Sequence, residues 1–196
     1  MMTQDEVAPA VAARADARAS RAVGDSVPDV QKQDREPDPH DVARQIVLRQ
    51  LAMAPRSRAE LMQKLAQRGC AADVAATVLD RMTQVGLVDD EAYAQMLVRS
   101  QQATRGLAKS ALARELGAKG IENYAADEAL ALISDEDERD RARALVDKKL
   151  RAMHGLGIDV QSRRLAGMLA RKGYSSSVAY AVIREAIADA PEHLPD

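Results

Sequence analysis

The feature that most constrains the fold of this chain is a pattern that occurs three times, each time around a glycine. The three glycines, Gly69, Gly120 and Gly173, are separated by 51 and 53 residues. A leucine stands eight and four residues before each of them, and apolar residues stand one, five, nine and ten residues after it. Self-similarity at a period near 50 residues is typical of tandem structural repeats.

Each copy of the pattern has a direct local interpretation. Two leucines four residues apart share one face of a helix. A glycine that follows a basic residue is a common helix stop, and the next residue enters the core. Apolar residues spaced for a third helix follow, and a further helix is expected before each copy, at about 41–53, 90–103 and 137–153. Each unit is therefore predicted to hold three short helices, close to a helix-turn-helix.

The predicted fold class is all-α, with three tandem three-helix repeats that form an elongated, curved body. We expect the repeats at residues 41–85, 86–134 and 135–190. Residues 1–40 hold eight acids, five bases and almost no large apolar side chains, which predicts a disordered acidic arm. Asp38 or Asp41 is expected to cap the first helix, and Ser134 the first helix of the third repeat.

Composition supports helices and an intracellular setting. Trp and Phe are absent and only four Tyr occur, whereas sheets use many aromatic residues. The single cysteine, Cys70, excludes an internal disulfide, and its repeat counterparts Ile121 and Tyr174 favour a buried packing role over that of a nucleophile. No stretch approaches the roughly 20 apolar residues of a membrane span, and the N-terminus lacks a signal-peptide core. We therefore expect a cytoplasmic protein.

Basic residues concentrate in the first and second helices of each repeat. The net charge is −2 overall, but the segments 44–68, 94–120 and 148–172 carry +5, +4 and +6. Solvated helix surfaces and cations near helix C-termini explain single residues of this kind. The repeated pattern instead predicts a surface for a polyanion or an acidic protein groove. The candidate contact residues are Arg56, Arg58, Lys64, Arg68, Arg99, Arg105, Lys109, Arg114, Lys119, Arg163, Arg164, Arg171 and Lys172.

Sequence signatures of catalysis are missing. The chain has neither a GxxxxGK nor a GxGxxG motif, and its three histidines are far apart and outside any HExxH. The acidic run from Asp135 to Asp140 does not fit a calcium loop because Arg139 stands at the fifth position. An acidic helix start explains this run better. We expect neither an enzyme nor a bound cofactor.

Over residues 43–187 the chain resembles the RecX family, the bacterial regulators of the recombinase RecA. The resemblance is carried by the first-unit string from Pro55 to Leu61, the second-unit string from Gly86 to Ala94 with Val98-Arg99-Ser100, and the third-unit string from Leu169 to Tyr174. Residues from Arg105 to Ile121 complete the second unit. Tyr93 stands where the family usually has Phe, and the loop after Ser100 is less basic than is typical.

The resemblance implies a partner and a function. It implies a monomer that lodges in the groove of RecA filaments on single-stranded DNA, where it suppresses ATP hydrolysis, strand exchange and the co-protease activity of the SOS response. Weak, sequence-independent binding to DNA is compatible with the same basic residues, and no membrane is involved. The alternative is a helix-turn-helix transcriptional regulator, but the expected third helices offer few Arg, Asn or Gln to read bases.

Overall fold

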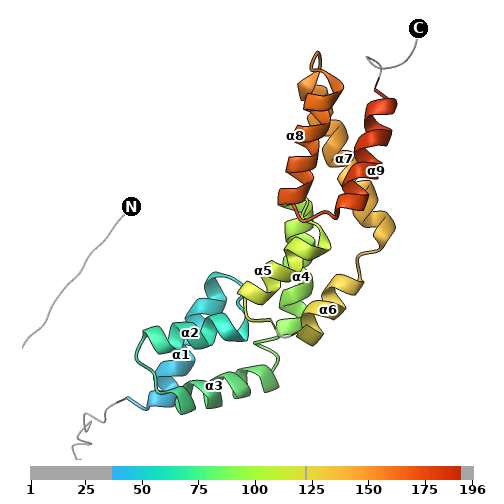
Figure 1. Cartoon of the computed structure of the whole chain (residues 1–196). Helices are drawn as coiled ribbons and strands as arrows, with labels where there is room; N and C mark the ends of the chain where they lie inside the picture. Colours follow the sequence, from blue (N-terminus) through green and yellow to red (C-terminus); the bar gives the residue numbers. More distant parts are fainter. Residues whose placement is uncertain (1–36, 122, 191–196) are drawn as a thin grey trace, which may run out of the picture. The chain divides into compact units, whose positions relative to one another are not determined.

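The computed structural model describes residues 37–121 and 123–190, and every regular element within them is helical. The expected all-α class is confirmed. The helices follow one another in three groups of three (Figure 1): α1 (Pro39–Met53), α2 (Arg58–Gln67) and α3 (Ala72–Gln84), then α4 (Asp90–Arg105), α5 (Lys109–Ala118) and α6 (Asn123–Ala131), then α7 (Asp135–Leu150), α8 (Ile158–Arg171) and α9 (Ser176–Ala188). We call these groups the first, second and third bundles.

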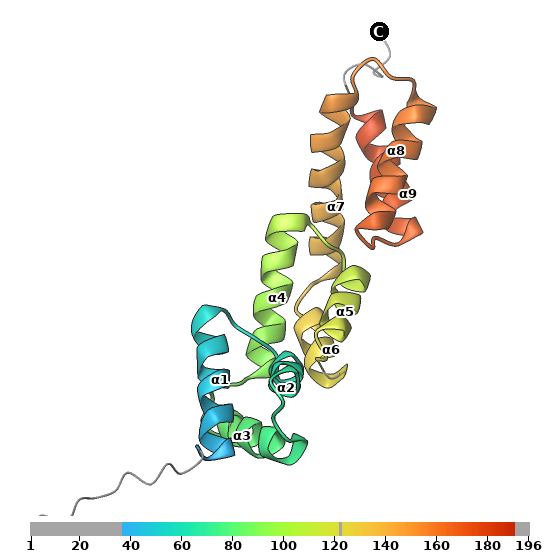
Figure 2. The ribbon, with the colours of Figure 1, turned by 90° about the vertical axis from the view of Figure 1, so that its left-hand side faces the viewer.

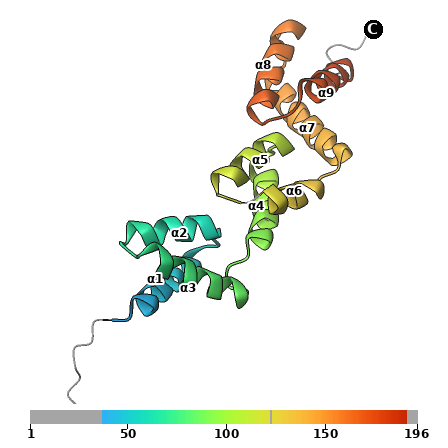
Figure 3. The same ribbon diagram turned by 60° about the horizontal axis from the view of Figure 1, so that its bottom comes forward.

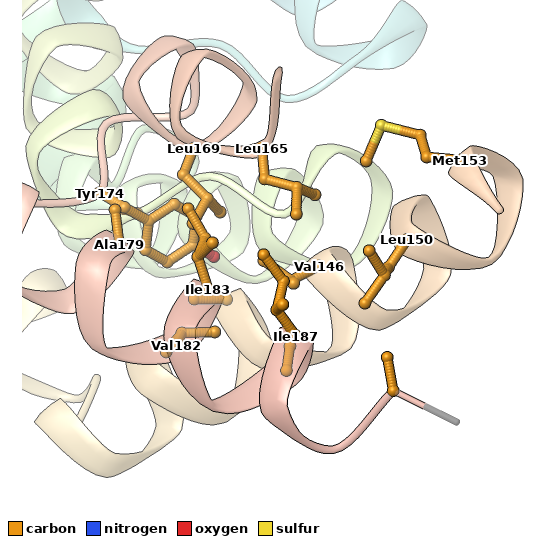
Figure 4. Close-up of a cluster of buried hydrophobic side chains, with 14 residues drawn as sticks. Val146, Leu150, Met153, Leu165, Leu169, Tyr174, Ala179, Val182, Ile183 and Ile187 are labelled. Atoms are coloured by element: carbon orange, nitrogen blue, oxygen red, sulfur yellow. The ribbon is translucent and has the colours of Figure 1, made fainter. Parts of the chain in front are cut away.

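Each bundle has its own apolar core. The leucines that stand eight and four residues before each repeat glycine, which we call the −8 and −4 leucines, are all at most 1% exposed. They are Leu61 and Leu65, Leu112 and Leu116, and Leu165 and Leu169. In the third bundle, Leu165 and Leu169 of α8 face Val182 and Ile183 of α9 and Val146 of α7 (Figure 4). The long helix α7 runs beside α8 and α9 (Figure 2). The sequence period therefore marks the residues that pack.

The predicted helix stop is confirmed in all three bundles. Gly69, Gly120 and Gly173 have φ of +78°, +69° and +86°, in the left-handed region that favours glycine. The residue after each glycine donates its backbone N–H to the carbonyl of the −4 leucine, at 3.1 Å in every copy. This bond pattern closes a Schellman motif and turns the chain into the third helix.

Helix starts also follow the sequence. Of the two possible caps of α1, Asp38 holds the position and accepts the His40 N–H at 2.9 Å. Ser134 caps α7 in a reciprocal capping box with Asp137, as expected. The first helix of the third bundle ends earlier than predicted, at Leu150, and a 3-10 turn covers Arg151–Met153. Of the predicted arm, residues 1–36 lie outside the described residues, and α1 already begins at Pro39.

Cys70 is half-buried and packs against the first core, whereas Ile121 and Tyr174 at the same repeat position are buried. The packing interpretation of this cysteine is confirmed, with less burial than expected. Among the described helices, none combines the length and apolar character that crossing a bilayer requires.

Candidate interaction surface and the joints between bundles

The first and second bundles meet where the N-terminus of α2 contacts the glycine turn after α5; we call this contact the first joint. The Ser57 hydroxyl is completely buried and donates to the Lys119 carbonyl at 2.6 Å. A Cβ built on Gly120 would lie 2.4 Å from the Cβ of Ala59. The close backbone approach therefore requires glycine for a second reason, beyond its positive φ.

The first joint also holds an ionic network centred on Glu60. Its carboxylate accepts the Lys119 ammonium at 2.7 Å, the Tyr93 hydroxyl at 3.2 Å and the Ser57 N–H at 3.3 Å, and Arg56 lies 3.7 Å away. Burial acts to raise the pKa of Glu60, but the bonds from Lys119 and Ser57 outweigh it and hold that pKa below its ordinary value. The bond to Glu60 raises the pKa of Lys119. The network favours the charged forms of both groups.

An acid from the following bundle satisfies the start of α2. The Arg58 backbone N–H, which has no partner inside its own helix, donates to the Asp90 carboxylate at 2.8 Å. The start of α5 is completed in the same way, because the Lys109 N–H donates to Glu138 of α7 at 2.8 Å. The second helices of the first two bundles, α2 and α5, are therefore each capped by the first helix of the following bundle.

The second joint repeats the first one bundle later. The Ser110 hydroxyl donates to the Gly173 carbonyl at 2.6 Å, and a Cβ on Gly173 would lie 2.7 Å from both the Cβ and the backbone N of Ala111. Ala108 donates its N–H to the Lys172 carbonyl at 2.9 Å and is buried in the core of the third bundle. Figure 3 shows α5 next to the third bundle and α2 next to the second.

Polar side chains complete the second joint. The Lys109 ammonium donates to Asp135 at 2.7 Å, and this bond raises the pKa of Lys109 and lowers that of Asp135. The Tyr174 hydroxyl donates to the Gly106 carbonyl at 3.1 Å, and burial raises the pKa of Tyr174 to about 12. The Tyr174 hydroxyl therefore stays protonated and keeps its bond throughout the neutral range.

Six of the thirteen candidate cations form an ion pair or a hydrogen bond across a joint. Five form ion pairs: Arg56 and Lys119 with Glu60, Arg58 with Asp80, Arg105 with Glu115, and Lys109 with Asp135. The sixth, Lys172, donates its ammonium to the Arg105 carbonyl. Sequence reasoning did not find these partners, and in four of the six contacts the two residues are 22 to 67 residues apart in the chain.

The remaining seven candidates form no ion pair with any acid of residues 37–121 and 123–190. They are Lys64 and Arg68 of the first bundle, Arg99 and Arg114 of the second, and Arg163, Arg164 and Arg171 of the third. Arg68 holds the repeat position that Lys119 and Lys172 occupy in the joints. Within residues 37–121 and 123–190 no other bundle packs against this turn, and Arg68 is exposed. These seven residues, named here the unpaired cations, can attract an anionic surface without first breaking an internal pair.

Two further features bear on binding. Lys64 and Arg56 line a hollow of about 220 Å³ together with Glu60, Gln63 and Gln67. Within the described ranges, no three His, Cys, Asp or Glu side chains gather closely enough to hold a metal ion.

Sequence reasoning missed the joint residues Ser57, Ser110, Asp90 and Glu138. A usable signal exists for one of them, because Ser57 followed by Glu60 reads as a capping box. The capping box does not predict that the Ser57 hydroxyl also bonds to the Lys119 carbonyl, which is 62 residues away in the chain.

Comparisons with known proteins agree with this architecture. Family models described as the first, second and third three-helix domains of RecX match residues 43–82, 89–130 and 135–183. "Regulatory protein RecX" of Streptomyces coelicolor is 47% identical over 162 residues, which cover 81% of this chain and 86% of that protein. "Regulatory protein RecX" of Mycolicibacterium vanbaalenii is 48% identical over 157 residues, which cover 76% and 85%.

Solved structures show the same fold. The crystal structure of RecX from Lactobacillus salivarius matches with a TM-score of 0.70 at 22% identity and covers 76% of this chain and 97% of that one. A second crystal structure, of regulatory protein RecX, matches with a TM-score of 0.67 at 26% identity and covers 76% and 72%. Three consecutive domain matches and close relatives along most of the chain lead to one conclusion: this protein belongs to the RecX family of regulatory proteins.

Proposed function

We propose that this protein binds RecA and the filament that RecA forms on single-stranded DNA, and that it inhibits ATP hydrolysis, strand exchange and co-protease activity. In this way it would modulate DNA repair and the SOS response in the cytoplasm. The observation that carries the proposal is the presence of unpaired cations on all three bundles. Family membership supports the identity of the target.

The mechanism we propose is binding without chemistry. A filament repeats its surface, so a chain with one cationic site on each of three bundles can contact several positions at once. Hydrogen bonds and close packing join the bundles, so the first contact brings the others near their sites and raises their effective concentration. A protein held across neighbouring subunits opposes the rearrangements that ATP turnover requires.

The joints divide the candidate residues into two roles. We propose that the unpaired cations contact RecA or the DNA backbone. Of the paired cations, Lys109, Lys119 and Lys172 make bonds across the joints, whereas Arg58 and Arg105 form ion pairs within their own bundles. Arg56 shares features of both groups, because it pairs with Glu60 only at 3.7 Å and its side chain is 37% exposed.

The proposal is tested by titrating the protein into RecA on single-stranded DNA and measuring ATP hydrolysis. We expect inhibition by the wild type and a loss of about tenfold or more in potency for the double variant Lys64→Glu/Arg68→Glu. The matched control is Arg49→Glu/Arg81→Glu, which makes the same charge change at exposed residues of the same bundle outside the proposed contact set.

Two outcomes would contradict the proposal. Unchanged ATP hydrolysis at a saturating ratio of protein to RecA would exclude the inhibitory function. Equal loss of potency in both double variants would show a response to net charge and not a contact at Lys64 and Arg68. A sequence-specific footprint on duplex DNA would instead support the transcriptional regulator.

A further inference from the structure

The third bundle carries an open groove between α8 and α9, with a volume of about 560 Å³. Its lining includes Ser162, Gly167, Tyr174, Ala179, Ile183 and Arg184. Tyr174, Ala179 and Ile183 belong to the buried core of the bundle, and Figure 4 shows their side chains close together. The groove therefore has an apolar floor, and small residues of α8 form one wall.

The corresponding place in the first bundle carries a bridge between its second and third helices. There, Arg58 of α2 and Asp80 of α3 form an ion pair at 2.7 Å that bridges the two helices. Counted from the repeat glycines, their counterparts in the third bundle are Ser162 and Arg184, which cannot form such a pair. Gly167 likewise stands where the first bundle has Gln63. The third bundle therefore lacks both the ion pair and the longer side chain that stand at these positions in the first bundle.

The rim of the groove is cationic. The Arg184 guanidinium lies over the exposed ring of Tyr180, 5.9 Å from its centroid. A guanidinium nitrogen of Arg171 lies 3.5 Å from the position of a Cβ on Gly167, and Arg163 precedes Gly167 by one helical turn.

Acids of α9 do not neutralise this rim because they are bound elsewhere. Glu185 pairs with Arg139 and Asp189 with Arg143, both on α7. The groove is thus left with positive charge at its edges.

We propose that this groove binds an amphipathic helix of a protein partner, with apolar side chains in the groove and carboxylates on the flanks. An apolar floor of this size fits the anchor residues of one helix face. The arginines at the rim would pair with acids beside those anchors. A nucleic acid fits less well, because the floor of Ala179 and Ile183 is apolar and offers no hydrogen-bond donor to phosphate oxygens.

The test uses a defined probe and the full chain. A fluorescein-labelled 16-residue helical peptide with leucines on one face and glutamates on the flanks is compared with a peptide in which lysines replace the glutamates. By fluorescence anisotropy, we expect the glutamate peptide to bind about tenfold tighter or more. Gly167→Leu fills the groove and should weaken that binding by about tenfold or more, and Arg184→Glu should remove the preference for glutamate.

Gln63→Leu is the matched control, because it places the same side chain at the corresponding exposed position of the first bundle. It should leave peptide binding unchanged. Circular dichroism of Gly167→Leu should remain that of the wild type, because only the mobile end of Arg171 approaches a Cβ at this position.

The proposal is overturned if the two peptides bind equally or if Gly167→Leu has no more effect than Gln63→Leu. It is also overturned if an oligo-dT strand, and not the peptide, shows the sensitivity to Gly167→Leu. These measurements contain no recombinase, so their outcome is independent of the RecA assay.

Discussion

The turns at Gly69 and Gly120 have the same local structure and different surroundings. Their φ values are +78° and +69°, and the following residue makes the same 3.1 Å bond to the −4 leucine. A Cβ on Gly69 would meet no heavy atom within 4 Å, whereas one on Gly120 would lie 2.4 Å from Ala59. The same sequence motif therefore ends a helix in both bundles. In the second bundle it also packs against the start of α2 of the first bundle.

Equivalent residues of two repeats can therefore have different contacts, depending on which bundle of the chain they belong to. Arg68 and Lys119 both precede the repeat glycine, but among the described residues only Lys119 meets an acid of another bundle, Glu60, which it binds at 2.7 Å. The exposed Arg68 stays available for a partner molecule. Repeats that are alike in sequence thus place the equivalent cation in a joint in one bundle and on the surface in another.

The strongest test of this comparison is valine at the two glycines. Gly69→Val should cost about 1–2 kcal/mol, the strain of a left-handed residue. Gly120→Val should cost about 3–5 kcal/mol, because overpacking against Ala59 adds to that strain. Urea unfolding measures both. Equal losses would show that Gly120 acts only as a helix stop.

A smaller effect is expected from Ser57→Ala, compared with Ser134→Ala. Both serines form capping boxes, but only Ser57 also donates to a carbonyl across a joint. Ser134→Ala should cost about 1 kcal/mol. Ser57→Ala should cost about 2–3 kcal/mol, because it also leaves the part-buried Lys119 carbonyl without its donor. If the two substitutions prove equally costly in urea unfolding, the bond across the joint contributes nothing.

The first joint also predicts a dependence on pH. The pKa of Glu60 in the folded protein lies below its ordinary value of 4.5, so the ionised group stabilises the fold above that pH. This contribution is lost as the pH falls through the lowered pKa. Urea midpoints between about pH 6 and 3 should therefore fall less steeply for Glu60→Gln than for the wild type. Parallel curves would refute the role of Glu60.

At alkaline pH the sign reverses for Lys119. Its pKa is raised above 10.5, so its contribution is present below that pH and is lost as the pH rises through the raised pKa.

The smallest effect is expected for Tyr93→Phe. The ring stays packed at 8% exposure, and only the hydroxyl bond to Glu60 at 3.2 Å is removed. The expected loss is about 0.5–1 kcal/mol. A double-mutant cycle with Glu60→Gln isolates this bond, and a coupling energy of zero would show that the hydroxyl and the carboxylate do not interact.

Local signals explain why the helices could be predicted. Leu61 and Leu65 lie on one face, Gly69 adopts positive φ, and Asp38 and Ser134 cap helices, all from chemistry within a few residues. The same signals recur in each bundle, so agreement among the copies strengthened each assignment. The charge pattern likewise indicated which helices carry the basic residues.

Which cations are unpaired was decided only by tertiary structure. Lys109 and Asp135 are 26 residues apart, and Ser110 and Gly173 are 63 apart, so no local rule predicts that they meet. The same holds for the groove of the third bundle, which depends on how α8 and α9 pack and on the absence of a bridge like that between Arg58 and Asp80. Helix stops depend on backbone conformation within one turn, whereas joints and grooves depend on contacts between distant segments.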